Sequence, residues 1–72
     1  MIYLEIGQCL LKELLDKRKM TQQQLVDLTG IDKSQLSGYI SNTRKMSLTN
    51  AKKIALVIKC NIDDLYEWKV ER

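Results

Sequence analysis

The sequence predicts a compact all-α domain of five helices. Three observations predict it: the chain has 72 residues, it contains no proline, and one helix-start signal recurs along it. In that signal an apolar residue precedes a capping Ser, Thr, Asp or Asn, and a Gln or acid three positions after the cap is followed by a second apolar residue. A chain of this length forms one domain, which we expect to span residues 1–72 with a core over about 5–68 and a short polar tail.

The first helix is expected over about residues 5–18, where apolar residues recur at helical spacing. The basic tripeptide KRK at 17–19 lies near its C-terminus, where the helix dipole favours cations. The residues expected to face inward are Ile6, Leu10, Leu11, Leu14 and Leu15.

The second helix is predicted over residues 22–29 by the segment MTQQQL at 20–25. Thr21 is the expected cap, and Gln24 is the residue that returns a hydrogen bond to the backbone of the cap. Gly30 follows at the position where a residue in the left-handed conformation commonly ends a helix.

The third helix, about residues 33–41, begins with IDKSQL, in which Asp32 is the expected cap and Gln35 its capping-box partner. Only three residues separate it from the second helix, so the two axes must cross steeply. Its apolar residues anchor one side, and a face that is small and uncharged suits the close approach of another surface. The residues of that face, which are mediocre or poor helix formers, are Ser34, Ser37, Gly38 and Ser41.

Two more start signals predict the remaining helices. Ser47 caps a helix over residues 48–58, and Asn61 with Asp64 begins a helix around residues 62–68. The residues that these two helices are expected to bury are Leu48, Ala51, Ile54, Ala55, Ile58, Ile62, Leu65 and Trp68.

The composition argues against several classes of function. The chain has no histidine, and its two cysteines, Cys9 and Cys60, lack CxxC spacing, so we expect free, buried thiols in a reducing compartment and no metal site. No phosphate-binding loop is present, and we expect neither an enzyme nor a bound cofactor or small-molecule ligand. Charged and polar residues interrupt the N-terminal apolar segment, which argues against a signal peptide or a membrane span and predicts a cytoplasmic protein.

The charges are unevenly distributed. The net charge is +3, but residues 1–16 and residues 60–72 each sum to −2, whereas residues 33–59 contain six basic residues and no acidic one. This excess fits either a solvated basic face or a polyanionic partner, and composition alone leaves both interpretations open.

Four motifs connect the chain to a known family. In order they are TQQQL followed by LTG, then IDKSQLSGYIS, then NTRKMSL, and finally NIDDL. With these motifs, residues 10–66 resemble the lambda-repressor-like, Xre/Cro-type helix-turn-helix DNA-binding family. The resemblance implies that the second and third predicted helices form the helix-turn-helix of a DNA-binding transcriptional regulator or repressor.

The sequence departs from the family pattern at several positions. Asn42 stands where the family typically has glycine after the third helix, and Asn is among the few residues that tolerate a positive φ. Met46 stands where proline is frequent. Leu15 and Ile40 replace an arginine and a glutamate that pair in many members, and we expect these two apolar side chains to touch.

The resemblance assigns roles to residues of the third helix and its surroundings. Such a helix enters the major groove, and Lys, Gln and Ser can each bond to base edges there. Three of these residues have an alternative role: Gln35 could complete the capping box, Lys33 could contact a phosphate, and Gly38 could allow close packing against another helix. The expected base-contacting residues are Lys33, Ser34, Gln35, Ser37 and Gly38, and the expected phosphate-contacting residues are Gln22, Ser41, Asn42, Thr43, Arg44 and Lys45.

The expected partner is double-stranded DNA, bound by a homodimer because one reading helix covers only a few base pairs. The segment YEWKVER at 66–72 is a candidate dimer interface, although packing in the core explains its aromatic residues equally well. The alternative function is a protein-interaction module with the same fold, such as an antitoxin or an accessory subunit.

Overall fold

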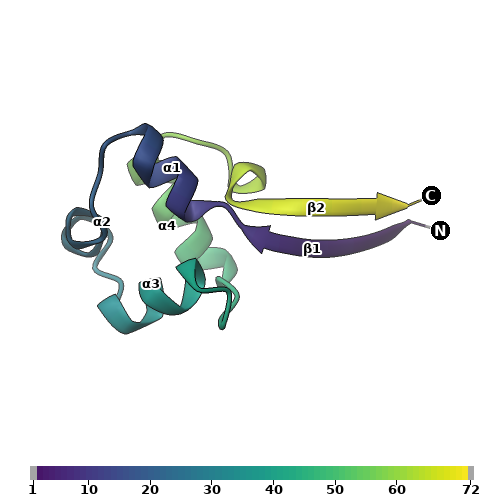
Figure 1. The fold of residues 1–72 in the computed structure, drawn as a ribbon, viewed down its shortest axis with the longest axis horizontal. Coiled ribbons are helices and arrows are strands. Elements are labelled where there is room, and N and C mark those ends of the chain that lie inside the picture. The colour runs from purple at the N-terminus through teal and green to yellow at the C-terminus, as the bar shows by residue number, and fades with distance from the viewer. Residues whose placement is uncertain (1, 72) are drawn as a thin grey trace.

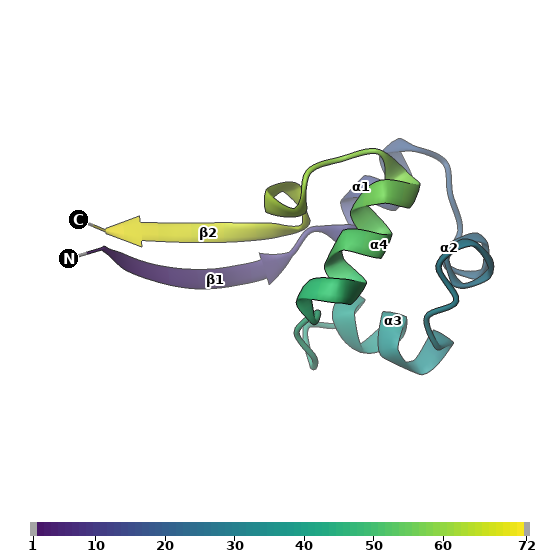
Figure 2. The ribbon, with the colours of Figure 1, turned by 180° about the vertical axis from the view of Figure 1, so that it is seen from behind.

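The computed structural model describes residues 2–71. Four α-helices form a body from which a two-stranded antiparallel sheet projects (Figure 1). The sheet joins the beginning of the chain to its end, so residues far apart in sequence lie side by side in both ribbon views (Figure 2). The elements in order are β1 (Tyr3–Cys9), α1 (Leu11–Lys17), α2 (Gln22–Thr29), α3 (Lys33–Ile40), α4 (Leu48–Ile58), the 3-10 helix η1 (Ile62–Leu65) and β2 (Tyr66–Glu71).

The expectation of an all-α fold with five helices is wrong at both ends of the chain. Residues 3–9 form β1 where the first helix was expected to begin, so α1 starts only at Leu11. The expected fifth helix is a single 3-10 turn that ends at Leu65 and continues as β2. The alternation of apolar and polar residues in YEWKV suits a strand with two different faces, and pairing with β1 satisfies its backbone.

The sheet has a definite register. Leu4 lies opposite Val70 and Ile6 opposite Trp68, and the register shifts between Ile6 and Cys9. Gly7 lies in that irregular stretch, where a Cβ atom would come within 2.9 Å of Glu67 Cβ. Absence of a side chain at this position therefore lets the two strands approach closely.

Two of the helices, α2 and α4, begin and end where the sequence predicts. Thr21 Oγ1 accepts from the Gln24 N–H at 3.1 Å, and Gln24 Oε1 accepts from the Thr21 N–H at 2.9 Å. Gly30 ends α2 with φ = 73°, and Ser47 Oγ accepts from the Asn50 N–H at the start of α4. Local hydrogen bonds thus fix the boundaries of α2 and α4.

The core lies between the helices and the inner end of the sheet. Cys9 is buried and Cys60 half-buried, and both are free thiols, as expected. Three residues expected in the core lie elsewhere: Leu48 is 77% exposed in the first turn of α4, and Ile6 and Trp68 are partly exposed on the sheet. The fully buried large side chains are Leu11, Leu25, Leu36, Ile54, Ile58 and Leu65.

In the described part of the chain, no helix has the length and apolar character needed to cross a membrane.

Leu15 of α1 and Ile40 of α3 border one hollow together with the start of α2. They therefore lie on the same side of the core, as the prediction that they touch requires.

Candidate nucleic-acid interface

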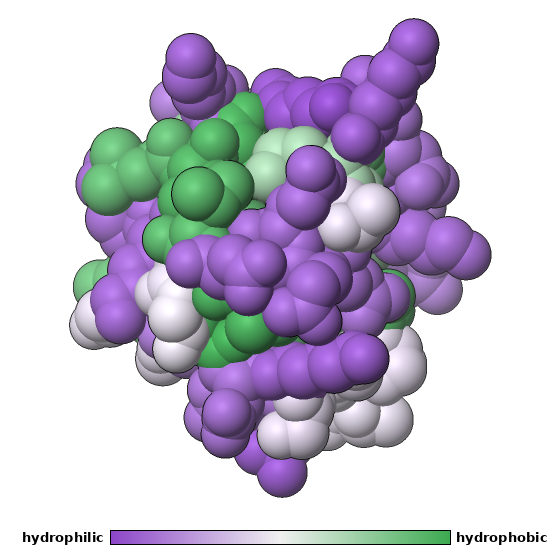
Figure 3. Space-filling view, turned by 90° about the vertical axis from the view of Figure 1, so that its left-hand side faces the viewer, coloured by the Kyte–Doolittle hydropathy of each residue, from purple (hydrophilic) through white to green (hydrophobic). Residues whose placement is uncertain are grey.

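The exposed side of α3 lies along one edge of the helical body (Figure 1). Leu36 and Tyr39 are buried and hold the helix against the core, while Lys33, Ser34 and Ser37 are exposed. Anchoring on one side thus leaves small, uncharged side chains and one lysine on the other. Figure 3 views the body from the α2 end, and its lower margin, where α3 lies, is mostly hydrophilic or near neutral.

The turn between α2 and α3 is held differently from the expectation. Asp32 occupies the N-cap position, but its side chain makes no capping hydrogen bond, so the predicted capping box with Gln35 is wrong. The side chain of Thr29 bonds to the turn instead. Its hydroxyl donates to the Leu25 carbonyl at 2.6 Å and accepts from the Ile31 N–H at 3.2 Å. Gln35 is half-buried, and its amide is not engaged in capping.

The C-terminal end of α3 is covered by the loop that follows. Gly38 is buried, and a Cβ atom there would lie 2.9 Å from Arg44 Cδ. The Gly38 carbonyl accepts from the backbone N–H groups of Thr43 and Arg44, at 3.0 and 3.1 Å. The expectation that Gly38 lies open on the outer face is therefore wrong, and the close packing is against a loop rather than against another helix.

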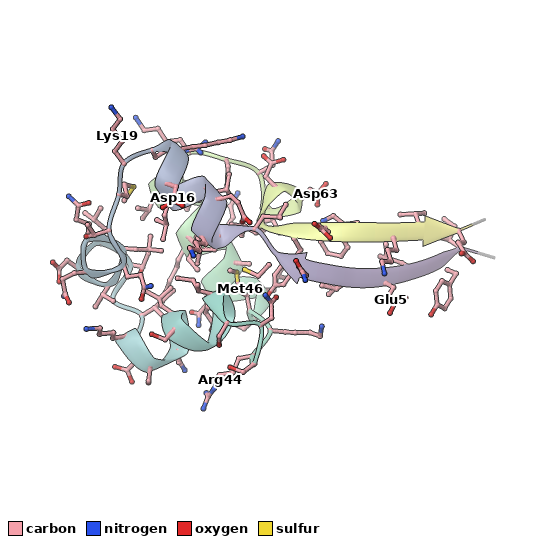
Figure 4. All side chains as sticks on the ribbon, viewed as in Figure 1. Glu5, Asp16, Lys19, Arg44, Met46 and Asp63 are labelled. Carbon is pink, nitrogen blue, oxygen red and sulfur yellow. The ribbon has the colours of Figure 1, made fainter. Side chains whose placement is uncertain are left out.

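Residues 41–45 form an exposed loop at the end of α3. Arg44 rests its aliphatic part on Gly38 and points away from the body, as Figure 4 shows. The hydroxyls of Ser41 and Thr43 lie 3.0 Å apart, and Lys45 is exposed beside them. The loop thus places two cations and two hydroxyls next to α3, which is the chemistry that phosphate groups recognise.

Asn42 has a second role that the sequence does not reveal. Its φ is 64°, as expected for a residue in place of glycine. Its side-chain Oδ1 also accepts from the backbone N–H of Cys9 at 2.7 Å, across 33 positions of the chain. The amide side chain therefore ties the loop to the end of β1.

Two tyrosine hydroxyls bond to the segment that follows the loop. The Tyr66 hydroxyl accepts from the Met46 N–H, and the Tyr39 hydroxyl accepts from Asn50 Nδ2, both at 3.0 Å. Burial raises the pKa of the Tyr66 phenol above its ordinary value. These contacts join α3 to α4 and β2 to Met46, and together with Thr29 they are structural parts of the site that sequence motifs do not indicate.

The remaining predicted residues occupy separate positions. Gln22, the first residue of α2, is exposed and borders the same hollow as Ile40, so this helix start opens beside α3. Lys19 lies at the opposite edge of the body from Arg44 (Figure 4), and Arg18 Nε donates to the Ile58 carbonyl at the end of α4. The KRK segment therefore does not add to the cations beside α3.

The chain is similar to several known proteins. Residues 10–71 match the Cro/C1-type HTH DNA-binding domain family. Over 73 aligned residues the chain is 51% identical to the SPbeta prophage-derived HTH-type transcriptional regulator YopS of Bacillus subtilis strain 168, and the match covers 100% of this chain and 99% of YopS.

YotL, a second SPbeta prophage-derived HTH-type transcriptional regulator of that strain, is 30% identical over 59 residues, which cover 81% of this chain and 74% of YotL. Among solved structures, the transcriptional regulator VanUg superposes with a TM-score of 0.72 at 25% identity, covering 94% of this chain and 89% of VanUg.

Proposed function

The chain belongs to the Cro/C1-type HTH DNA-binding domain family, and on this premise we propose that it is a transcriptional regulator that binds double-stranded DNA sequence-specifically through α3. The observation that carries the proposal is the exposed side of α3. Ser34 and Ser37 are exposed there, between Lys33 at the helix start and Arg44 at its end. Small hydrogen-bonding side chains flanked by cations suit a helix that lies in the major groove.

The residues divide into two classes by what they would contact. The residues that would contact base edges are the exposed Lys33, Ser34 and Ser37, together with Gln35. Gln35 is half-buried, but its amide is available because it does not cap its own helix. Gln22 at the start of α2 and the 41–45 loop would bond to phosphates on either side of the groove. Within that loop, Arg44 and Lys45 carry the charge, whereas Asn42 serves mainly to hold the loop in place.

We propose further that two copies bind a two-fold site with half-sites about one helical turn, roughly 34 Å, apart. A single α3 reads few base pairs, so pairing of two copies supplies the specificity that regulation needs. Free thiols at Cys9 and Cys60 support a reducing location, the cytoplasm.

A duplex selected from a random pool provides the ligand for the test, with a scrambled duplex for comparison. Arg44→Ala should weaken binding to both duplexes and lower the slope of log affinity against log salt by about 1, because one phosphate contact is lost. Lys19→Ala removes the same charge at the opposite edge and is the matched control.

Ser34→Ala should weaken binding to the selected duplex by roughly tenfold and leave the scrambled duplex unchanged, because it removes a base contact only. Absence of salt-sensitive binding to any duplex at low salt would contradict the proposal and favour the interaction module.

A further inference from the structure

The sheet has one apolar face that the helices leave largely uncovered. Alternate residues of a strand share a face, and so do residues directly opposite in the register. Leu4, Ile6, Trp68 and Val70 therefore lie on the same face, whereas the opposite face carries charged residues such as Glu5 and Lys69. Figures 1 and 2 show the outer part of the sheet extending beyond the helices.

This face continues onto the helical body. Leu4, Trp68 and Val70 line one hollow, with Asp63 as its one charged residue. Trp68 also lines a second hollow with Ile6 and with Leu48 of α4. Trp68 Nε1 donates to the Asp63 carbonyl at 2.9 Å, so the polar atom of the indole is already bonded within the chain. The exposed remainder of the ring is apolar, and the surface is continuous from Val70 to Leu48.

The area of this surface is near the lower limit for a stable interface between two copies. Leu4 is 56% exposed, Ile6 36%, Leu48 77%, Trp68 37% and Val70 53%. With about 200 Å² for each fully exposed residue, the middle of the range for large side chains, these fractions amount to at most roughly 500 Å² on one copy and about 1,000 Å² on two. Specific interfaces begin at about this total area, so a second copy would bind weakly and reversibly.

We propose that this apolar face is a homodimer interface, at which the sheets of two copies pack face to face. The packing removes an exposed apolar surface from water and leaves the charged faces of both sheets in solvent. It also covers a two-stranded sheet, an arrangement that is marginal without a packing partner. In a two-fold dimer the same surface of each copy forms the interface, so a single apolar face is enough.

The shape of the molecule suits the two-fold DNA site, and this step alone rests on the proposed function. The molecule is 41 Å long, and the six residues of β2 extend about 20 Å, roughly half of that length. When the two sheets overlap along their full length, the centres of the two helical bodies lie about 40 Å apart, close to the 34 Å between the centres of two half-sites. Because α3 runs along one long side of the molecule (Figure 2), one two-fold axis keeps both copies of α3 on the same side.

Sedimentation equilibrium of the whole protein over a range of concentrations tests the interface without DNA. Leu4→Lys and Tyr3→Lys are matched variants, since the two positions are adjacent, 56% and 57% exposed, and on opposite faces of the sheet. Leu4→Lys should raise the dimer dissociation constant at least tenfold, and Tyr3→Lys should leave it within twofold. Trp68, the single tryptophan, gives a readout in the unaltered protein, because its emission should shift to shorter wavelength as the dimer forms.

DNA binding separates failure of the interface from failure of the proposed function. All three proteins should bind a duplex with one half-site equally, whereas Leu4→Lys should bind a two-site duplex at least tenfold more weakly than Tyr3→Lys. A wild-type protein that stays monomeric at millimolar concentration, or equal effects of both variants on dimerisation, overturns the interface. Dimerisation without any duplex binding overturns the proposed function and leaves the interface standing.

Discussion

Asn42 combines two structural roles, and three substitutions separate them. Asn42→Gly keeps the backbone free to adopt φ = 64° but removes the oxygen that accepts from Cys9. Asn42→Ala removes the same oxygen and keeps a Cβ atom at positive φ, but without the polar side chain that lets asparagine adopt this conformation. Asn42→Asp keeps both the acceptor and the tolerance of positive φ, so it is the matched control.

The magnitudes follow from the contact. Cys9 is 7% exposed, so its N–H would lose its partner in a place with little access to water, at a cost of about 1–3 kcal/mol. Asn42→Ala should lower the free energy of unfolding by about 1 kcal/mol more than Asn42→Gly does, because an alanine is strained in the left-handed region. Asn42→Asp should stay within about 0.5 kcal/mol of the wild type. For a domain of this size, each kcal/mol lowers the melting temperature by roughly 4–8 °C.

Urea unfolding followed by circular dichroism and by Trp68 fluorescence measures the free energy of unfolding of each variant. The expected order of stability is wild type and Asn42→Asp, then Asn42→Gly, then Asn42→Ala. If Asn42→Gly is as stable as the wild type, the bond to Cys9 contributes nothing and the reasoning is wrong. If Asn42→Ala equals Asn42→Gly, the left-handed conformation carries no cost at this site.

Two further predictions concern the loop and the response to pH. Gly38→Ala should not lower the free energy of unfolding, because alanine favours a helix by about 1 kcal/mol. The new Cβ atom, 2.9 Å from Arg44 Cδ, should displace that arginine and weaken DNA binding. An unchanged affinity in anisotropy titrations would contradict this. Burial raises the pKa of Cys9 above 9.0 and of Tyr66 above 10.0. The native state therefore retains protons that the unfolded chain releases. The free energy of unfolding should keep its full value below about pH 9 and fall as the pH rises through the native pKa values. Urea unfolding between about pH 8 and pH 10.5 checks this: Cys9→Ala should flatten the decline, and a stability independent of pH over that range would refute it.

Sequence reasoning succeeds where structure depends on neighbouring residues. The Thr21 and Gln24 capping box, the left-handed Gly30 and the Ser47 cap each involve groups within three or four positions, and α2 and α4 have the predicted bounds. Asn42 at positive φ follows from the same kind of local rule. Such signals act through a few hydrogen bonds that the sequence itself specifies.

Two of the failures have a non-local cause. β1 pairs with β2 across 57 to 68 positions, and the apolar residues of β1 fit a helical pattern as well as a strand until that partner is known. Gly38 lies opposite Leu36 on a helical wheel, yet the later loop folds back over it. Asp32 has the side chain of a cap, but Thr29 bonds to the turn instead. The sheet and the covering of Gly38 depend on where another segment of the chain lies, whereas the bonds of Thr29 are local and replace a cap that the sequence also allows.

Pairing of the first strand with the last sets an order on synthesis of the protein. The first helices are made well before the last strand, and β1 has no partner until residues 66–71 have been synthesised. At about 5–20 residues per second, that interval is roughly 3–12 s. During it the apolar side chains of β1 lack their partner strand, and we expect the sheet to close late in folding because it joins the most distant segments of the chain.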